Sequence, residues 1–143
     1  MESDPQTMVE ALGVAEVFRS PAKASILVMH PTPETLAAAW DFLRTVEPVR
    51  DWKLPPAEQV EFRVTKDKHT LGAHTTYRWT KEHIVYLSAS CVSHCDTMLR
   101  ILAHEMVHAA MAEAGNNPVA HNRAYWERAV PLCANMGWDP KAF

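Results

Sequence analysis

The chain from Ser93 to Gly115 reads SHCDTMLRILAHEMVHAAMAEAG, the strongest helical pattern in the sequence. Ser93 and Asp96 form a capping-box pattern at its start, and Gly115 stands where a helix would end. Between them, apolar side chains recur at helical spacing: Met98, Leu99, Ile101, Leu102, Met106 and Val107. The stretch therefore predicts one long helix against which the rest of the chain packs.

This predicted helix contains the motif His104-Glu105-Met106-Val107-His108. Residues four apart lie on one face of an α-helix, so the two histidines can present nitrogens to one metal ion at about 2.0–2.1 Å. Glu105 lies about 100° further around the helix, where its carboxylate can reach a water molecule at the metal without being a ligand. We therefore predict a metal site with two histidine ligands and Glu105 as the general base.

The two histidines have an ordinary alternative, because the chain contains eight histidines and some must be side chains of amphipathic helices. Small apolar residues surround the motif, and unpaired imidazoles would find few hydrogen-bond partners among them. These neighbours are Ala103, Ala109, Ala110 and Ala112. A bound metal ion would satisfy the imidazoles, which favours the metal site.

A catalytic zinc ion needs a third protein ligand and one open position. After a turn at residues 115–118, Asn117-Pro118 predicts a second helix with His121 in its first turns, where two antiparallel helices would converge on one ion. Glu127 is the alternative third ligand. Six residues correspond to about 240° of rotation on a helix, so the two side chains point in different directions. We expect His121 to be the ligand.

The donor that would stabilise the oxyanion of a reaction intermediate is not selected by the sequence. The candidates are Tyr125, His74, Tyr77 and Arg123. Tyr125 follows His121 by one helical turn and is the preferred candidate, although its alternative role is core packing. His74 is expected to precede a strand and to be exposed. Four other histidines lack partner spacing and are expected at the surface: His30, His69, His83 and His94.

The remaining patterns predict an α+β fold with a small three-stranded sheet, antiparallel or mixed, packed on the long helix and flanked by further helices. Helices are expected at residues 6–19 and 33–46, and after Asn117, where Pro131 would break the last helix. Strands are expected at 60–64, 75–79 and 83–88, arranged as a meander. An exposed edge on the strand at 83–87 would hold a substrate in extended form.

Length and composition predict a single globular domain over residues 1–143, with 48% hydrophobic and 22% charged residues. A net charge of −3 argues against strong binding of nucleic acid by this chain. We expect neither a membrane span nor a secretory signal, and three cysteines favour a reducing, cytoplasmic location. Cys91, Cys95 and His94 form a weaker candidate for a second metal site, with ordinary buried thiols as the favoured alternative.

The order of these motifs resembles that of the SprT-like zinc metallopeptidases, which include the eukaryotic Spartan proteases. The resemblance spans about residues 32–136 and is most specific from Ile84 to His121. The matching segments are Thr32-Pro33, residues 60–64, Leu71-Gly72, Ile84 to Ser88, residues 104–109 and Ala120-His121. Where that group usually has Gly-His-Gly, this chain has Ala120-His121-Asn122.

The resemblance implies a zincin-like fold with one catalytic Zn²⁺ as cofactor. It implies His104, His108 and His121 as zinc ligands and Glu105 as the catalytic acid and base. The expected activity is hydrolysis of peptide bonds in a protein or peptide substrate. Two alternatives stay open: a zinc-stabilised binding module that cuts nothing, and a zinc peptidase that uses Glu127 as its third ligand.

Overall fold

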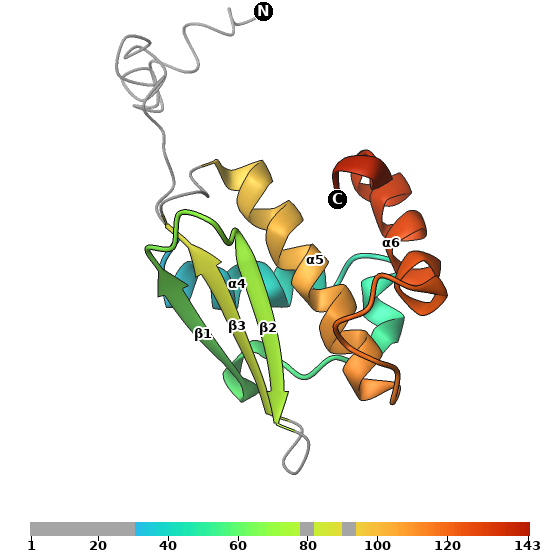
Figure 1. The fold of residues 1–143 in the computed structure, drawn as a ribbon, viewed down its shortest axis with the longest axis horizontal. Coiled ribbons are helices and arrows are strands. Elements are labelled where there is room, and N and C mark those ends of the chain that lie inside the picture. The colour runs from blue at the N-terminus through green and yellow to red at the C-terminus, as the bar shows by residue number, and fades with distance from the viewer. Residues whose placement is uncertain (1–30, 78–81, 90–93) are drawn as a thin grey trace, which may run out of the picture.

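A computed structural model describes residues 31–77, 82–89 and 94–143. Over these residues the protein is α+β, with three α-helices and a three-stranded mixed sheet (Figure 1), and the predicted fold class is confirmed at this level. The helix predicted at residues 6–19 and the thiol of Cys91 lie outside the described residues. No helix in the described ranges has the length and apolar character needed to cross a membrane.

Three short 3-10 helices accompany the helices and strands, at Val49–Trp52, Ala57–Gln59 and Pro140–Ala142. In chain order, the α-helices and β-strands are α4 (Pro33–Leu43), β1 (Val60–Thr65), β2 (Gly72–Tyr77), β3 (Glu82–Ser88), α5 (Cys95–Glu113) and α6 (Arg123–Met136).

Helix α4 begins as the sequence predicts. The backbone N–H of Thr35 donates to the Thr32 hydroxyl at 3.1 Å, and the Thr35 hydroxyl accepts from the Thr32 N–H at 2.7 Å. Trp40 is fully buried, and its indole N–H donates to the carbonyl of Pro55 at 2.8 Å. Its ring meets Phe62 edge-on at 5.7 Å, which joins α4 to β1.

The sheet has the strand order β1-β3-β2, so the predicted meander is wrong. β3 pairs parallel with β1 and antiparallel with β2. The expected free edge on β3 is also wrong, because β3 is the central strand. Ile84, Val85 and Leu87 on β3 are at most 3% exposed, and a strand that is apolar on both faces is stable only when it is covered on both sides.

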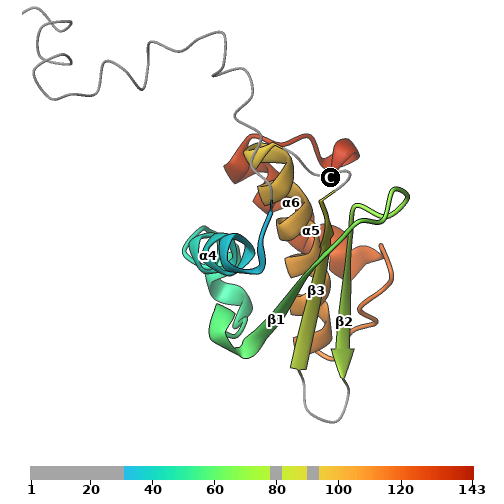
Figure 2. The same cartoon turned by 90° about the vertical axis from the view of Figure 1, so that its left-hand side faces the viewer.

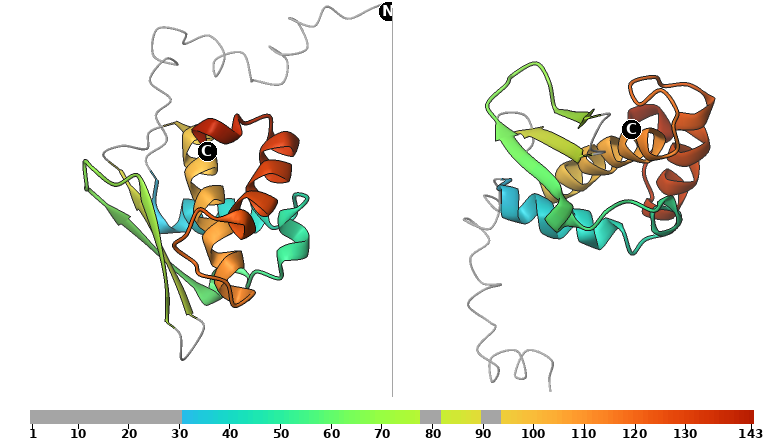
Figure 3. Two further views of the ribbon diagram at one scale, coloured as in Figure 1. Left: turned by 45° about the vertical axis from the view of Figure 1, so that its right-hand side comes forward. Right: turned by 90° about the horizontal axis from the view of Figure 1, so that it is seen from below.

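One face of the sheet carries the core side chains. Residues paired across strands share a face, so Phe62, Val85 and His74 lie on this face, as do Leu87 and Gly72. α4 covers this face beneath β1, while α5 packs against β2 and β3 (Figures 2 and 3). α5 lies between the sheet and α6, so its side chains are enclosed on several sides.

Helix α5 has His94 as its N-cap residue, one position after the predicted capping serine, and no side chain caps its first turn. Gly115 follows with φ +78°, a left-handed conformation that glycine adopts without strain. The prediction that the helix ends at this glycine is confirmed.

Helix α6 begins later than the sequence predicts. The side chain of Asn117 accepts from the N–H of Val119 at 3.2 Å and forms a local turn instead of a helix cap. The true N-cap is Asn122, whose side-chain oxygen accepts from the N–H of Tyr125 at 3.3 Å. The expected break at Pro131 is absent, because α6 continues through this exposed residue to Met136.

Candidate metal centre

Three imidazole rings converge at the junction of α5 and the loop before α6. His104 and His108 are one turn apart on α5, and His121 lies just before the N-cap of α6 instead of inside the helix. Nε2 of His108 is 3.1 Å from Nε2 of His104 and 3.2 Å from Nε2 of His121. Across the described residues, this is the one group of three histidine, cysteine or acidic side chains close enough to hold an ion.

The two separations from Nε2 of His108 fit a single tetrahedral ion. Metal–nitrogen bonds of about 2.0–2.1 Å place two ligand nitrogens about 3.3 Å apart. Hydrogen bonds alone satisfy the cluster poorly, because Nε2 of His108 approaches two other Nε2 atoms and carries either one proton or one lone pair. A cation that accepts three lone pairs removes this conflict.

The protonation of the cluster also suits a cation. Burial, followed by the neighbouring His108 and His121, lowers the pKa of His104 to about 4. Burial, followed by His121, lowers the pKa of His108 as well. Metal ligation requires neutral imidazoles, and these two rings are held neutral at physiological pH.

Tyr125 on α6 contacts two of the three imidazoles, those of His104 and His121. Its hydroxyl oxygen lies 2.9 Å from Nδ1 of His104, and its ring stacks on His121 with centroids 4.4 Å apart. When Nδ1–H of His104 donates to this hydroxyl, Nε2 is left with its lone pair facing the other two rings. Tyr125 is 1% exposed, and burial raises the pKa of its phenol, so the hydroxyl keeps its proton.

Residues 138–143, which the sequence analysis did not single out, form another wall of the centre. The ring of Phe143 lies 5.4 Å from that of His104. Trp138 stacks on Phe143 at 5.9 Å, and Arg100 on α5 donates to the carbonyl of Ala142. No motif marks this segment, because its contacts depend on how the chain returns to α5.

Glu105 is buried beside the edge strand β2. The residue is 5% exposed, and a Cβ atom added at Gly72 would lie 3.3 Å from its Oε1. Burial raises the pKa of Glu105 to about 7. A carboxyl group with this pKa can accept and return a proton near neutral pH, as the predicted general base requires.

The alternative ligand Glu127 is not brought to the cluster. Its carboxylate accepts from Nε of Arg123 at 2.7 Å, and both side chains are exposed. The same contact occupies Arg123, one of the candidate oxyanion donors. The side chain of Tyr77, another candidate, lies outside the described part of the structure. Cys95 is an exposed free thiol, so the described residues do not assemble the second metal site that includes it.

The positions of two other histidines differ from the prediction. His74 lies within β2 and is half-buried, and His83 at the start of β3 is only 1% exposed. Nε2 of His74 is 2.7 Å from Nδ1 of His83, and Nε2 of His83 is 2.7 Å from Oε1 of Glu113. Sequence spacing gives no signal for this group, because its members come from β2, β3 and the end of α5.

No protein-family model matches the chain, and a comparison with curated proteins finds no match.

Proposed function

We propose that this protein is a zinc-dependent endopeptidase of the SprT-like type, with a zincin-like fold in which α5 is the metal-binding helix. The observation that carries the proposal is the convergence of His104, His108 and His121, together with a buried Glu105 on the same helix. Three imidazoles leave a tetrahedral ion one open position, which distinguishes a catalytic site from a closed structural one. Imidazole also binds other divalent ions, so the identity of the metal as zinc is itself proposed.

The chain supplies the proton transfer. A bound zinc ion would lower the pKa of a water molecule toward about 7 and polarise the scissile carbonyl. Glu105 takes the proton that this water loses and gives it to the leaving amine. Its carboxylate is buried beside Gly72, where any larger side chain would crowd it.

The substrate would lie along β2. β2 is an edge strand beside α5, and Gly72 on this strand adjoins Glu105. The backbone of an edge strand can pair with an extended peptide, which would bring a scissile bond past the metal centre. The strand differs from the one expected from the sequence, but the mode of binding is the same.

A zinc-stabilised binding module is the alternative function. Such a module would close the fourth metal position with another protein ligand. The described residues offer no fourth histidine, cysteine or acidic group within the cluster. This favours an open position and therefore an enzyme.

Metal content and cleavage of an unfolded protein, measured on the same samples, test the proposal. We expect one equivalent of zinc in the wild type and in Glu105→Gln, but cleavage only in the wild type. His121→Ala should lose zinc, whereas Glu127→Ala should keep it and serves as the matched control. Cleavage by Glu105→Gln at the wild-type rate would exclude Glu105 as the base. A wild type that binds zinc without cutting would favour the binding module.

A further inference from the structure

Two side chains of α5 hold the 138–143 segment along one row of that helix. The indole N–H of Trp138 donates to Oδ1 of Asp96 at 3.1 Å. One helical turn later, Arg100 donates to the carbonyl of Ala142. Residues four apart share a face of a helix, so both anchors lie on the same row. The next position of this row is the first histidine of the metal cluster.

Phe143 reaches the metal cluster from this row. Its ring lies 5.4 Å from that of His104 and 6.5 Å from that of Tyr125. Trp138 stacks on the ring at 5.9 Å, which supports it from the side of the anchors. The side chain of Phe143 is only partly buried. Part of its apolar surface is therefore accessible to a molecule bound at the metal.

His104 lies between this segment and β2. At about 100° per residue, Arg100 lies about 40° around α5 from His104 in one direction. Glu105, which lies beside Gly72 of β2, is about 100° away in the other direction. Figures 1 and 3 accordingly show the segment and the sheet on opposite sides of α5. An extended peptide paired with β2 at the metal would therefore have Phe143 on its other side.

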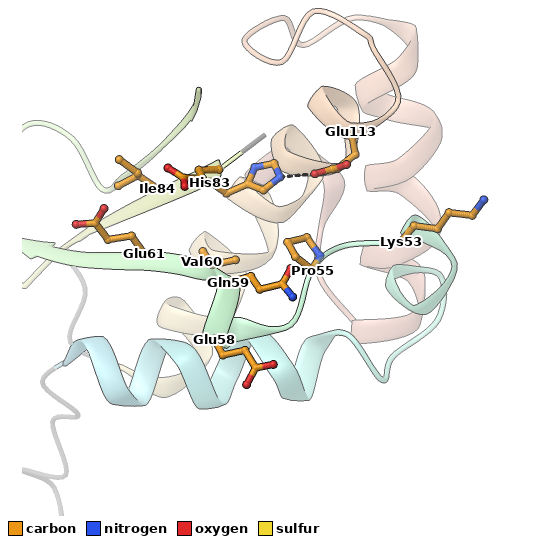
Figure 4. A pocket seen from close by; sticks show the side chains of 10 residues that line it. Lys53, Pro55, Glu58, Gln59, Val60, Glu61, His83, Ile84 and Glu113 are labelled. Carbon is orange, nitrogen blue, oxygen red and sulfur yellow. Dashed lines mark hydrogen bonds and ion pairs between the residues drawn. The ribbon is translucent and has the colours of Figure 1, made fainter. Parts of the chain in front are cut away.

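The cavity of about 810 Å³ near the other end of α5 has different walls. It lies between the starts of β1 and β3 and the end of α5, beyond His108. Figure 4 shows Glu113 at its wall, joined to His83 by a hydrogen bond. Four of its lining residues are glutamates: Glu58, Glu61, Glu82 and Glu113. A large apolar side chain of a substrate gains more from contact with Phe143 than from entering this acidic cavity.

We propose that Phe143 is a specificity-determining residue, whose ring selects substrates with a large apolar side chain beside the scissile bond. The contact would remove apolar surface of both partners from water. The substrate class is then an unfolded protein segment, because folded proteins bury most of their large apolar side chains. Asp96 and Arg100 are positioning residues, since they hold the segment that carries Phe143. This selection rests on the proposed peptidase function.

Peptide binding to the zinc-loaded Glu105→Gln protein tests the selection without cleavage. The probes are dye-labelled, alanine-rich decapeptides that contain either one leucine or one asparagine, two side chains of similar size. We expect the leucine peptide to bind about 10-fold more tightly, and Phe143→Ala to remove most of this difference. Phe42→Ala removes a phenylalanine of α4 that is 53% exposed and should keep the difference. Equal affinities for the two peptides, or binding of neither, would overturn the proposal.

Cleavage of the same peptides separates the selection from the peptidase function. The wild type should cut the leucine peptide with about 10-fold higher kcat/KM, mainly through a lower KM, and Phe143→Ala should raise that KM. Equal kcat/KM for both peptides would overturn the selection alone. Faster cleavage of both by Phe143→Ala would also overturn it, because the segment would then obstruct the site. A wild type that cuts no protein or peptide would contradict the peptidase function, while the binding preference could still be measured.

Arg100→Met tests the positioning role. This substitution removes the donor to the carbonyl of Ala142 and should reduce the leucine preference, whereas Arg100→Lys keeps a donor and should restore most of it. Arg100→Met should have no further effect on the preference in a Phe143→Ala background, because it acts through that ring. Additive effects of the two substitutions would exclude Arg100 as a positioning residue for Phe143.

Discussion

The hydroxyl oxygen of Tyr125 lies 2.9 Å from Nδ1 of His104, at the edge of the ring away from the nitrogen that faces His108. Partners of this kind fix the orientation and tautomer of a metal ligand. Tyr125→Phe should therefore weaken zinc binding about 10- to 100-fold while the fold is retained. Competition with a chromophoric chelator measures the affinity.

The matched control for this substitution is Tyr86→Phe. The Tyr86 hydroxyl faces Arg63 at 3.4 Å on the other face of the sheet. Its loss should leave zinc affinity unchanged. Equal affinity in Tyr125→Phe and the wild type would show that the 2.9 Å contact does not orient His104.

Gly72 gives β2 room to approach α5. An added Cβ would lie 2.8 Å from Cγ2 of Ile101 and 3.3 Å from Oε1 of Glu105, both too close without movement. Gly72→Ala should lower the free energy of unfolding by about 1–3 kcal/mol, because a packed interface resists an added methyl group. It should also displace Glu105 and reduce kcat.

A double-mutant cycle with Ile101→Ala isolates the cause. Removal of the Ile101 side chain relieves the shorter contact, so Gly72→Ala should cost less stability in that background than in the wild type. Urea denaturation of the four proteins measures the coupling. Additive losses would indicate that the two residues do not interact through this contact.

The three histidine ligands could be predicted because they lie close together in the sequence. His104 and His108 share one helical turn, so their spacing alone brings their rings together. His121 follows a short connection and also reaches the cluster, although the structure places it before the helix and not within it. Local rules were sufficient here because few residues separate the ligands.

The non-local features could not be predicted in the same way. The sheet order depends on which strand is best covered on both faces, and β3 takes the centre although β2 precedes it. The chain of His74, His83 and Glu113 joins three elements across that unexpected order. The contact of Phe143 with His104 similarly depends on tertiary packing. The spacing of residues along the sequence does not predict such contacts.

Acid should destabilise the metal-free protein. Burial is the main cause that lowers the pKa of His74 to about 3 and of His104 to about 4 from 6.5, and it lowers that of His108. Below pH 6.5 the unfolded chain therefore binds more protons than the folded protein. The stability that these neutral histidines contribute is fully present above that pH and declines as the pH falls.

Glu105 acts in the opposite direction. Burial raises its pKa from 4.5 to about 7, so its contribution is present below pH 4.5 and is lost as the pH rises through 7. Three histidines outweigh one carboxyl group. The urea concentration at the midpoint of unfolding should therefore decrease as the pH is lowered from about 6.5 to about 4.5. Glu105→Gln should make this fall steeper. Midpoints that rise on acidification would contradict the assigned pKa directions.

The N-cap of α6 should matter for metal binding as well as for stability. Asn122 follows His121 directly, and its side chain accepts from the Tyr125 N–H at 3.3 Å. Asn122→Ala should lower the free energy of unfolding by about 0.5–2 kcal/mol, as loss of a cap usually does. The frayed turn would carry Tyr125 and directly follows His121, so zinc affinity should fall too.

Thr32→Ala separates the two effects. Thr32 caps α4 through the Thr35 N–H at 3.1 Å, in a helix that contributes no ligand. Its replacement should cost a similar amount of stability and leave zinc affinity unchanged. Thermal denaturation and chelator competition on both variants give the comparison. If both lost affinity equally, global stability and not the local position of His121 would set the strength of metal binding.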